Sequence, residues 1–104
     1  MAMNQQAMLK QVKKMQKKME EIQAATALET VEASAGGGMV VATVSGDLKV
    51  KDIKIDPEAL DPEDVEMLQD MIVAAVNQGL EDAQELASKR MSAVTGGMNI
   101  PGLF

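Results

Sequence analysis

A helix period runs through the last third of the chain for about 32 residues. Its apolar residues are Val65, Leu68, Ile72, Ala75, Val76, Gly79, Ala83 and Leu86. Asp61 is the expected N-cap, Pro62 fits the first helical position, and the pattern stops where two glycines follow Thr95. Such a helix would be roughly 48 Å long, which is more than a small sheet can cover. Part of it must therefore project or pack against a second subunit.

The middle of the chain contains three short runs rich in β-branched residues, LETVEAS (28–34), MVVATVS (39–45) and LKVKDIKI (48–55). The turn signals between them are Gly36-Gly37-Gly38 and Ser45-Gly46-Asp47. Because apolar residues alternate along the runs, they predict a three-stranded antiparallel meander. The alternation changes phase between Val50 and Ile53, which predicts a bulge or a change of buried face. A phosphate-cradling loop would need a helix after the three glycines, and a strand follows instead, so they predict a hairpin turn.

Residues 4–26 have a second helix period with two distinct faces. The apolar face has nearly heptad spacing and comprises Met8, Val12, Met15, Met19 and Ile22. The basic face comprises Lys10, Lys13, Lys14, Lys17 and Lys18. At 100° per residue the apolar face covers about 80°, and the lysines cover about 140° on the other side. The apolar face predicts packing against another helix.

These patterns predict one α+β domain over residues 1–104. Its expected parts are a basic amphipathic helix at 1–26, an antiparallel sheet at 28–55, a long helix at 61–95 and an extended tail at 96–104. Aromatic residues are only 1% of the chain, so the core must consist of Met, Val, Ile, Leu and Ala. Ten methionines make such a core adaptable and loosely specified, and oligomerisation is one way to stabilise it.

The residue types that are missing exclude several kinds of chemistry. Without Cys or His, the chain has no thiolate nucleophile, zinc finger or imidazole base. The carboxylates of DPEALDPEDVE (56–66) lack EF-hand spacing and are explained by helix capping and a polar helix face. We therefore expect no enzyme, no cofactor, no metal and no small-molecule substrate. The N-terminus lacks a signal peptide's apolar run and no stretch approaches the roughly 18 apolar residues of a membrane span, which predicts a soluble cytoplasmic protein.

Positive charge is concentrated at the start of an acidic chain. Residues 1–19 contain five lysines and no acid, whereas residues 20–104 contain five basic and sixteen acidic residues, a balance of −11. Lysines four residues apart repel one another along the first helix, and cations near a helix N-terminus also oppose its dipole. This arrangement favours an external anion, for which the phosphates of nucleic acid are the natural choice.

Other interpretations of the basic residues stay open. The lysines of the first helix would also suit a solvated surface, or an anionic membrane, although no Trp or Phe is present on that helix to anchor it in lipid. Lys89 and Arg90 near the end of the last helix would complement the helix dipole, with Lys89 paired to Glu85, or they would form a second basic contact beside the first helix.

Four segments together resemble the YbaB/EbfC family of bacterial nucleoid-associated DNA-binding proteins. They are MLKQVKKMQKKMEEIQ, AGGGMVVATVSG, KVKDIKIDPEALDPEDVEMLQDMIVAAVNQGL and SAVTGGMNIPGLF. The resemblance covers nearly the whole chain, and KIDPEAL, VAAVNQGLEDA and the TGGM…PG ending are its most specific parts.

The resemblance implies a tweezer-like homodimer with a central sheet and projecting helices, which binds DNA with little sequence preference and serves nucleoid organisation or gene regulation. It places the DNA contacts on the projecting helices. In this chain the candidates are Lys10, Lys13, Lys14, Lys17 and Lys18, with Lys89 and Arg90 as secondary ones.

We therefore expect a homodimer that grips double-stranded DNA in the bacterial nucleoid, without membrane contact. Duplex is favoured because the chain lacks the aromatic residues on which single strands stack. The alternative is a protein interaction module or adaptor without direct DNA binding, in which the lysines only keep the protein soluble.

Overall fold

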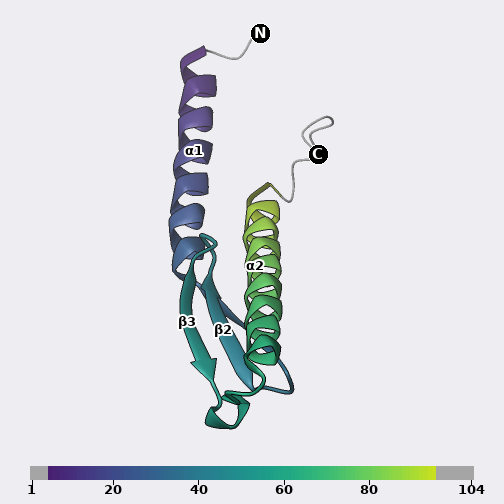
Figure 1. Ribbon diagram of the computed structural model, residues 1–104. Coiled ribbons are helices and arrows are strands. Elements are labelled where there is room, and N and C mark those ends of the chain that lie inside the picture. Colours follow the sequence, from purple (N-terminus) through teal and green to yellow (C-terminus); the bar gives the residue numbers. More distant parts are fainter. Residues whose placement is uncertain (1–4, 96–104) are drawn as a thin grey trace.

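The computed structural model describes residues 5–95, in which two long helices flank a three-stranded sheet (Figure 1). The elements in order are α1 (Gln5–Leu28), β1 (Thr30–Ala35), β2 (Val40–Ser45), β3 (Val50–Ile55), the short 3-10 helix η1 (Pro57–Ala59) and α2 (Val65–Thr95). The predicted α+β class is confirmed. The tail expected at 96–104 lies outside the described residues.

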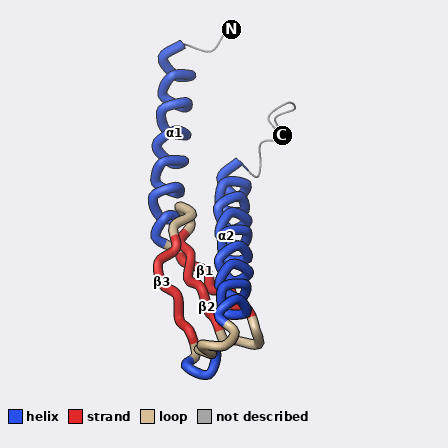
Figure 2. The backbone as a smooth tube through the Cα atoms, in the orientation of Figure 1, coloured by secondary structure: helices blue, strands red, loops and turns tan. Residues whose placement is uncertain are grey.

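The sheet is the antiparallel meander that the sequence predicts, with strand order β1-β2-β3 (Figure 2). Thr43 pairs with Asp52, but Val44 pairs with Val50, so Lys51 is an extra residue on β3. The predicted change of phase along the third strand is therefore a β-bulge. The glycines 36–38 form the β1–β2 turn, with φ angles of 64°, 68° and 94°. Residues with a Cβ atom rarely adopt such positive φ angles, so this turn favours glycine.

One face of the sheet carries α2, which packs mainly against β1 and β2. Val40, Ala42 and Ala75 are buried at the centre of this contact. Around them pack partly buried apolar residues of the sheet and of α2, namely Ala35, Ile55, Leu68, Met71, Ile72 and Val76. The fully buried apolar side chains among the described residues are only alanines and valines, so the core of the single chain is thin.

The long helix α2 begins at Val65, and the prediction that Asp61 is its N-cap was wrong. The side chain of Asp61 instead accepts a hydrogen bond from the Glu63 N–H at 3.0 Å, within a turn that the Asp64 N–H closes on the Asp61 carbonyl. Asp64 caps the helix by accepting from the Met67 N–H at 3.2 Å. Because the turn at 61–64 comes before the helix, the cap is Asp64, three residues later than expected from the sequence.

Both helices extend beyond the sheet toward the same end of the molecule, where they lie side by side (Figure 1). The molecule is elongated, with dimensions of 76 × 24 × 16 Å. The opposite end contains the β1–β2 turn, η1 and the start of α2 (Figure 1). The expectation that the helices exceed the length of the sheet is confirmed.

Candidate nucleic-acid interface

The base of α1 is fixed to the sheet at the turn between β2 and β3. Thr26 is buried there, and the Gly46 N–H donates to the Glu29 carbonyl at 2.8 Å. A Cβ atom at position 46 would overlap the Thr26 carbonyl oxygen, so the close approach of turn and helix requires glycine. The rest of α1 is directed away from the sheet from this anchored end.

The first part of α1, residues 5–18, is exposed along its whole length. The apolar face predicted for this helix is covered only near its base, where Met19 and Ile22 are partly buried. Farther out, Met8, Val12 and Met15 are 49%, 52% and 39% exposed. Among residues 5–95, then, no helix packs over this outer apolar stripe.

The basic face of α1 consists of Lys10, Lys13, Lys14, Lys17 and Lys18, and all five side chains are exposed. Within residues 5–95, none of them forms a hydrogen bond or an ion pair. From Lys10 to Lys18 the helix rises about 12 Å, a length over which one DNA strand presents three to four phosphates, roughly one per 3.4 Å. These side chains are therefore free to contact an external polyanion.

Lys89 and Arg90, the secondary candidates, already have carboxylate partners. Lys89 lies 3.6 Å from Glu85, which is the pair that the sequence suggested. Arg90 donates two hydrogen bonds to Glu29, at 2.8 and 3.0 Å. The hydrogen bond from Arg90 holds the pKa of Glu29 below its ordinary value, against the opposing effect of lost solvent. Both cations are thus partly neutralised before any ligand arrives.

The structure does not bring all seven candidates into one patch. Glu29 directly follows the last residue of α1, so its partner Arg90 lies at the base of the helix. Lys18 precedes Leu28, the last residue of α1, by ten residues, which is about 15 Å along the helix. The lysines of α1 form one basic face, and Lys89 and Arg90 belong to a separate set of paired charges.

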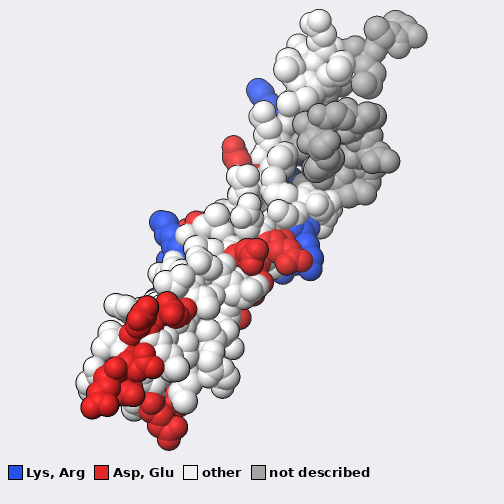
Figure 3. Space-filling model, turned by 45° about the vertical axis from the view of Figure 1, so that its right-hand side comes forward, with Lys and Arg blue, Asp and Glu red and all other residues white. Residues whose placement is uncertain are grey.

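A cluster of acidic side chains lies at the end of the molecule away from the outer part of α1, and other acidic side chains lie along its middle (Figure 3). The exposed acids between β3 and the second turn of α2 are Asp56, Glu58, Asp61, Glu63, Asp64, Glu66 and Asp70. No Lys or Arg stands between Lys54 and Lys89 in the sequence. A polyanion would therefore be attracted to the α1 end and repelled from this one.

Two further observations concern the part of the chain that the structure describes. Neither of its long helices is apolar enough to cross a lipid bilayer. No three His, Cys, Asp or Glu side chains within 5–95 come together as metal ligands would.

The sequence and the fold both match known proteins. A protein of Alkaliphilus metalliredigens named nucleoid-associated protein is 60% identical, over 99% of this chain and 90% of its own length. A protein of the same name from Syntrophobacter fumaroxidans is 56% identical, over 91% and 86%. In fold, the chain is similar to the crystal structure of the uncharacterized protein HP0035 from Helicobacter pylori, with a TM-score of 0.73, 23% identity, and coverage of 93% of this chain and 99% of that one. The YbaB/EbfC DNA-binding family matches residues 1–98, and the chain therefore belongs to that family.

Proposed function

We propose that the protein is a nucleoid-associated protein that binds duplex DNA through phosphate contacts from the lysine faces of two α1 helices in a homodimer. The observation that carries the proposal is the set of five exposed α1 lysines without acidic partners within residues 5–95. The family's description as DNA-binding supports it, as do the names of the relatives. Binding of this kind contributes to nucleoid organisation or to gene regulation.

Low sequence specificity follows from the chemistry of this face. Lysine presents a compact charge rather than the planar fork with which arginine reads guanine. Contacts to phosphates fix the position of a protein on DNA and carry no sequence information directly. A face of five lysines should therefore bind unrelated duplexes with similar affinity.

A second copy of the chain would complete the thin core. Val50 and Ile53 pair with Val44 and Ala42, so they lie on the face of the sheet that α2 covers. Because α2 crosses β1 and β2, these two residues of β3 remain 42% and 39% exposed. We call Val50 and Ile53 the β3 strip. Burying this strip against the same strip of a second copy would form a two-fold dimer, which would carry two lysine-bearing α1 helices, or arms.

The test is duplex binding against salt concentration, measured by gel shift or fluorescence anisotropy on two unrelated sequences. Log K should fall linearly with log salt, with a slope of about −0.9 for each phosphate contacted. Five to ten contacts would give a slope between about −4.5 and −9. A flat salt dependence would contradict the electrostatic grip.

The variant for this test is the double charge reversal Lys14→Glu with Lys17→Glu, which should abolish binding while the dimer stays folded. The matched control is Lys49→Glu with Lys54→Glu, the same change of charge on exposed lysines near and on β3. If binding survives the reversal on α1, or is lost equally in the control, the α1 face is not the contact.

The alternative function is a protein interaction module without DNA. The exposed stripe of Met8, Val12 and Met15 favours it, because methionine-rich surfaces adapt to several partners. This alternative requires that no duplex is shifted even at low salt, while a protein partner is retained after reversal of Lys14 and Lys17.

A further inference from the structure

Two hollows flank the start of α2, at the acidic end of the molecule. One, of about 460 Å³, lies between the first turns of α2 and the β1–β2 turn. The other, of about 330 Å³, lies between the same part of α2 and the η1 segment. They share Gly36, Asp64, Met67 and Met71, so they form one groove, which we call the methionine groove.

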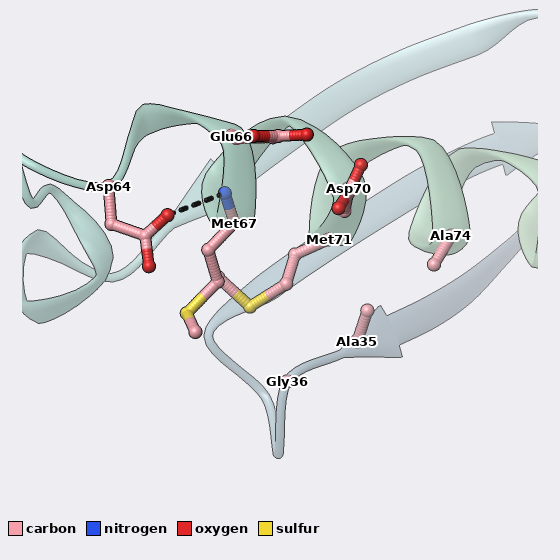
Figure 4. A pocket seen from close by; sticks show the side chains of 8 residues that line it. All are labelled: Ala35, Gly36, Asp64, Glu66, Met67, Asp70, Met71 and Ala74. Carbon is pink, nitrogen blue, oxygen red and sulfur yellow. Dashed lines mark hydrogen bonds between the residues drawn. The ribbon is translucent and has the colours of Figure 1, made fainter.

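The floor of the methionine groove is apolar and flexible. Met67 and Met71 extend from the same side of α2 toward Gly36 (Figure 4). A Cβ atom at Gly36 would overlap the sulfur of Met71, which shows how closely this side chain lies on the turn. Met67 is exposed, and Met39 lines the groove from the start of β2. Methionine side chains of this kind fit helices of varied shape.

The rim of the groove is acidic, with carboxylates on both sides of the methionines. On the α2 side they are Asp64, Glu66 and Asp70, and on the η1 side they are Glu58 and Asp61. No basic side chain lines either hollow among the described residues. Because no three of the described carboxylates gather as metal ligands would, the rim does not form a site for a hard cation.

An acid-rimmed apolar groove selects an amphipathic helix with an apolar stripe beside basic residues. The outer part of α1 has this composition, with Met8, Val12 and Met15 on one face and the lysines on the other. We propose that the methionine groove of one copy binds the outer part of α1 from another copy. The methionines would meet at the groove floor, and the lysines nearest the apolar face, Lys14 and Lys18 on one side and Lys13 on the other, would reach the acidic rim.

The contact cannot form within one protomer. The outer part of α1 and the methionine groove lie at opposite ends of a molecule 76 Å long (Figure 1). A contact between different surfaces of successive copies is heterologous, and it extends into open chains unless its rotation closes a ring. Dimers would therefore associate into longer assemblies, and DNA would compete with the groove for the same lysines.

The test is sedimentation velocity of the full-length protein across salt concentrations, without DNA. At low salt, species larger than the dimer should form, and they should dissociate near 1 M salt, where the Debye length is about 3 Å. Reversing a rim charge with Asp70→Lys should weaken this association by about tenfold, because an attraction becomes a repulsion. The matched control is Glu81→Lys, an exposed acid of α2 outside the groove, which should leave the association unchanged.

A charge exchange separates the proposed contact from a general effect of charge. A groove variant with Glu66→Lys and Asp70→Lys should not assemble alone, nor should an arm variant with Lys14→Glu and Lys18→Glu, the two lysines beside the apolar face of α1. A mixture of the two should associate again, because reversed arms meet reversed grooves. Absence of association at low salt, equal effects of Asp70→Lys and Glu81→Lys, or failure of the mixture to associate would each overturn the proposal.

The proposal does not depend on DNA binding, and duplex binding by the variants keeps the two apart. Asp70→Lys leaves the α1 lysines intact, so this variant should still bind duplex DNA. Because the chain has no cysteine, a mixture of Val12→Cys and Met67→Cys proteins gives an independent reading of the contact. Mild oxidation should link positions 12 and 67 at low salt, and a link from position 12 to Glu81→Cys at equal yield would contradict the assignment.

Discussion

The ion pair between Arg90 and Glu29 joins two residues that are 61 positions apart in the sequence. It lies at the point where α1 ends and β1 begins. The hydrogen bonds from Arg90 lower the pKa of Glu29 more than lost solvent raises it, and the charge of Arg90 lowers it further. A lowered carboxyl pKa means that the unfolded chain binds the proton more readily than the folded one. The pair therefore stabilises the fold fully above the ordinary carboxyl pKa, and this contribution disappears as the pH falls through the lowered value.

We predict that Glu29→Gln reduces the free energy of unfolding slightly at neutral pH and flattens its dependence on pH in the acid range. The loss should be small because both side chains of the pair are partly in solvent. Urea unfolding at a series of pH values measures this. Glu32→Gln, an exposed acid on β1, is the control and should keep the parental slope. An unchanged slope in the Glu29→Gln variant would mean that the ion pair does not persist in solution.

At the scale of single elements, Asp61 and Asp64 stand in similar sequence contexts, but only Asp64 caps α2. We predict that Asp64→Ala destabilises the protein by about 1 kcal/mol, because it removes the acceptor for the Met67 N–H at the helix start. Asp61→Ala should cost less, since Asp61 accepts only within an exposed turn before the helix. Urea unfolding of the two variants gives the comparison. A larger loss for Asp61→Ala would restore Asp61 as the true helix start.

Local sequence patterns predict where the helices and strands lie, but they do not predict which residues of different elements contact one another. The change from a helix period to alternation predicts the α1, sheet and α2 segments, and the phase change before Ile53 predicts the bulge at Lys51. Strand β3 begins at Val50 rather than at Leu48, because Leu48 adopts a positive φ of 64° in the turn. Spacing along a helix cannot reveal that Arg90 reaches Glu29, since that depends on how α2 crosses the sheet.

The candidate site divides in the same way. The α1 lysines lie on one exposed face, as expected of residues whose relation depends only on helix geometry. The pairing of Lys89 with Glu85 is equally local. The methionine groove had no signal in the sequence, because Gly36 and Met71 meet only through the packing of α2 on the β1–β2 turn.

The whole molecule is long, with the exposed lysine face of α1 toward one end and the methionine groove at the other, where Figure 3 shows a cluster of acidic side chains. Because the lysine face and the acidic groove lie at different ends, each end would make a different contact in the proposed assembly. The outer part of α1 would contact phosphates or the groove of another copy, whereas the β3 strip would join two copies. The two α1 helices of such a dimer would bind the same duplex at a high effective concentration, so the dimer should bind DNA far more tightly than one α1 helix does.

We predict that Ile53→Asp separates the dimer into monomers and, with the lysines intact, weakens duplex binding by at least about tenfold. Ile53 is 39% exposed because α2 packs on β1 and β2 and leaves β3 uncovered on the same face of the sheet, so a charge there would oppose its burial against a second copy. Sedimentation at high salt and anisotropy with duplex DNA measure the two effects. Leu60→Asp is the control, an apolar residue outside β3 that is 58% exposed. If Ile53→Asp remains a dimer, the strip on β3 is not the interface, and if it becomes a monomer with unchanged affinity, one arm alone suffices for DNA.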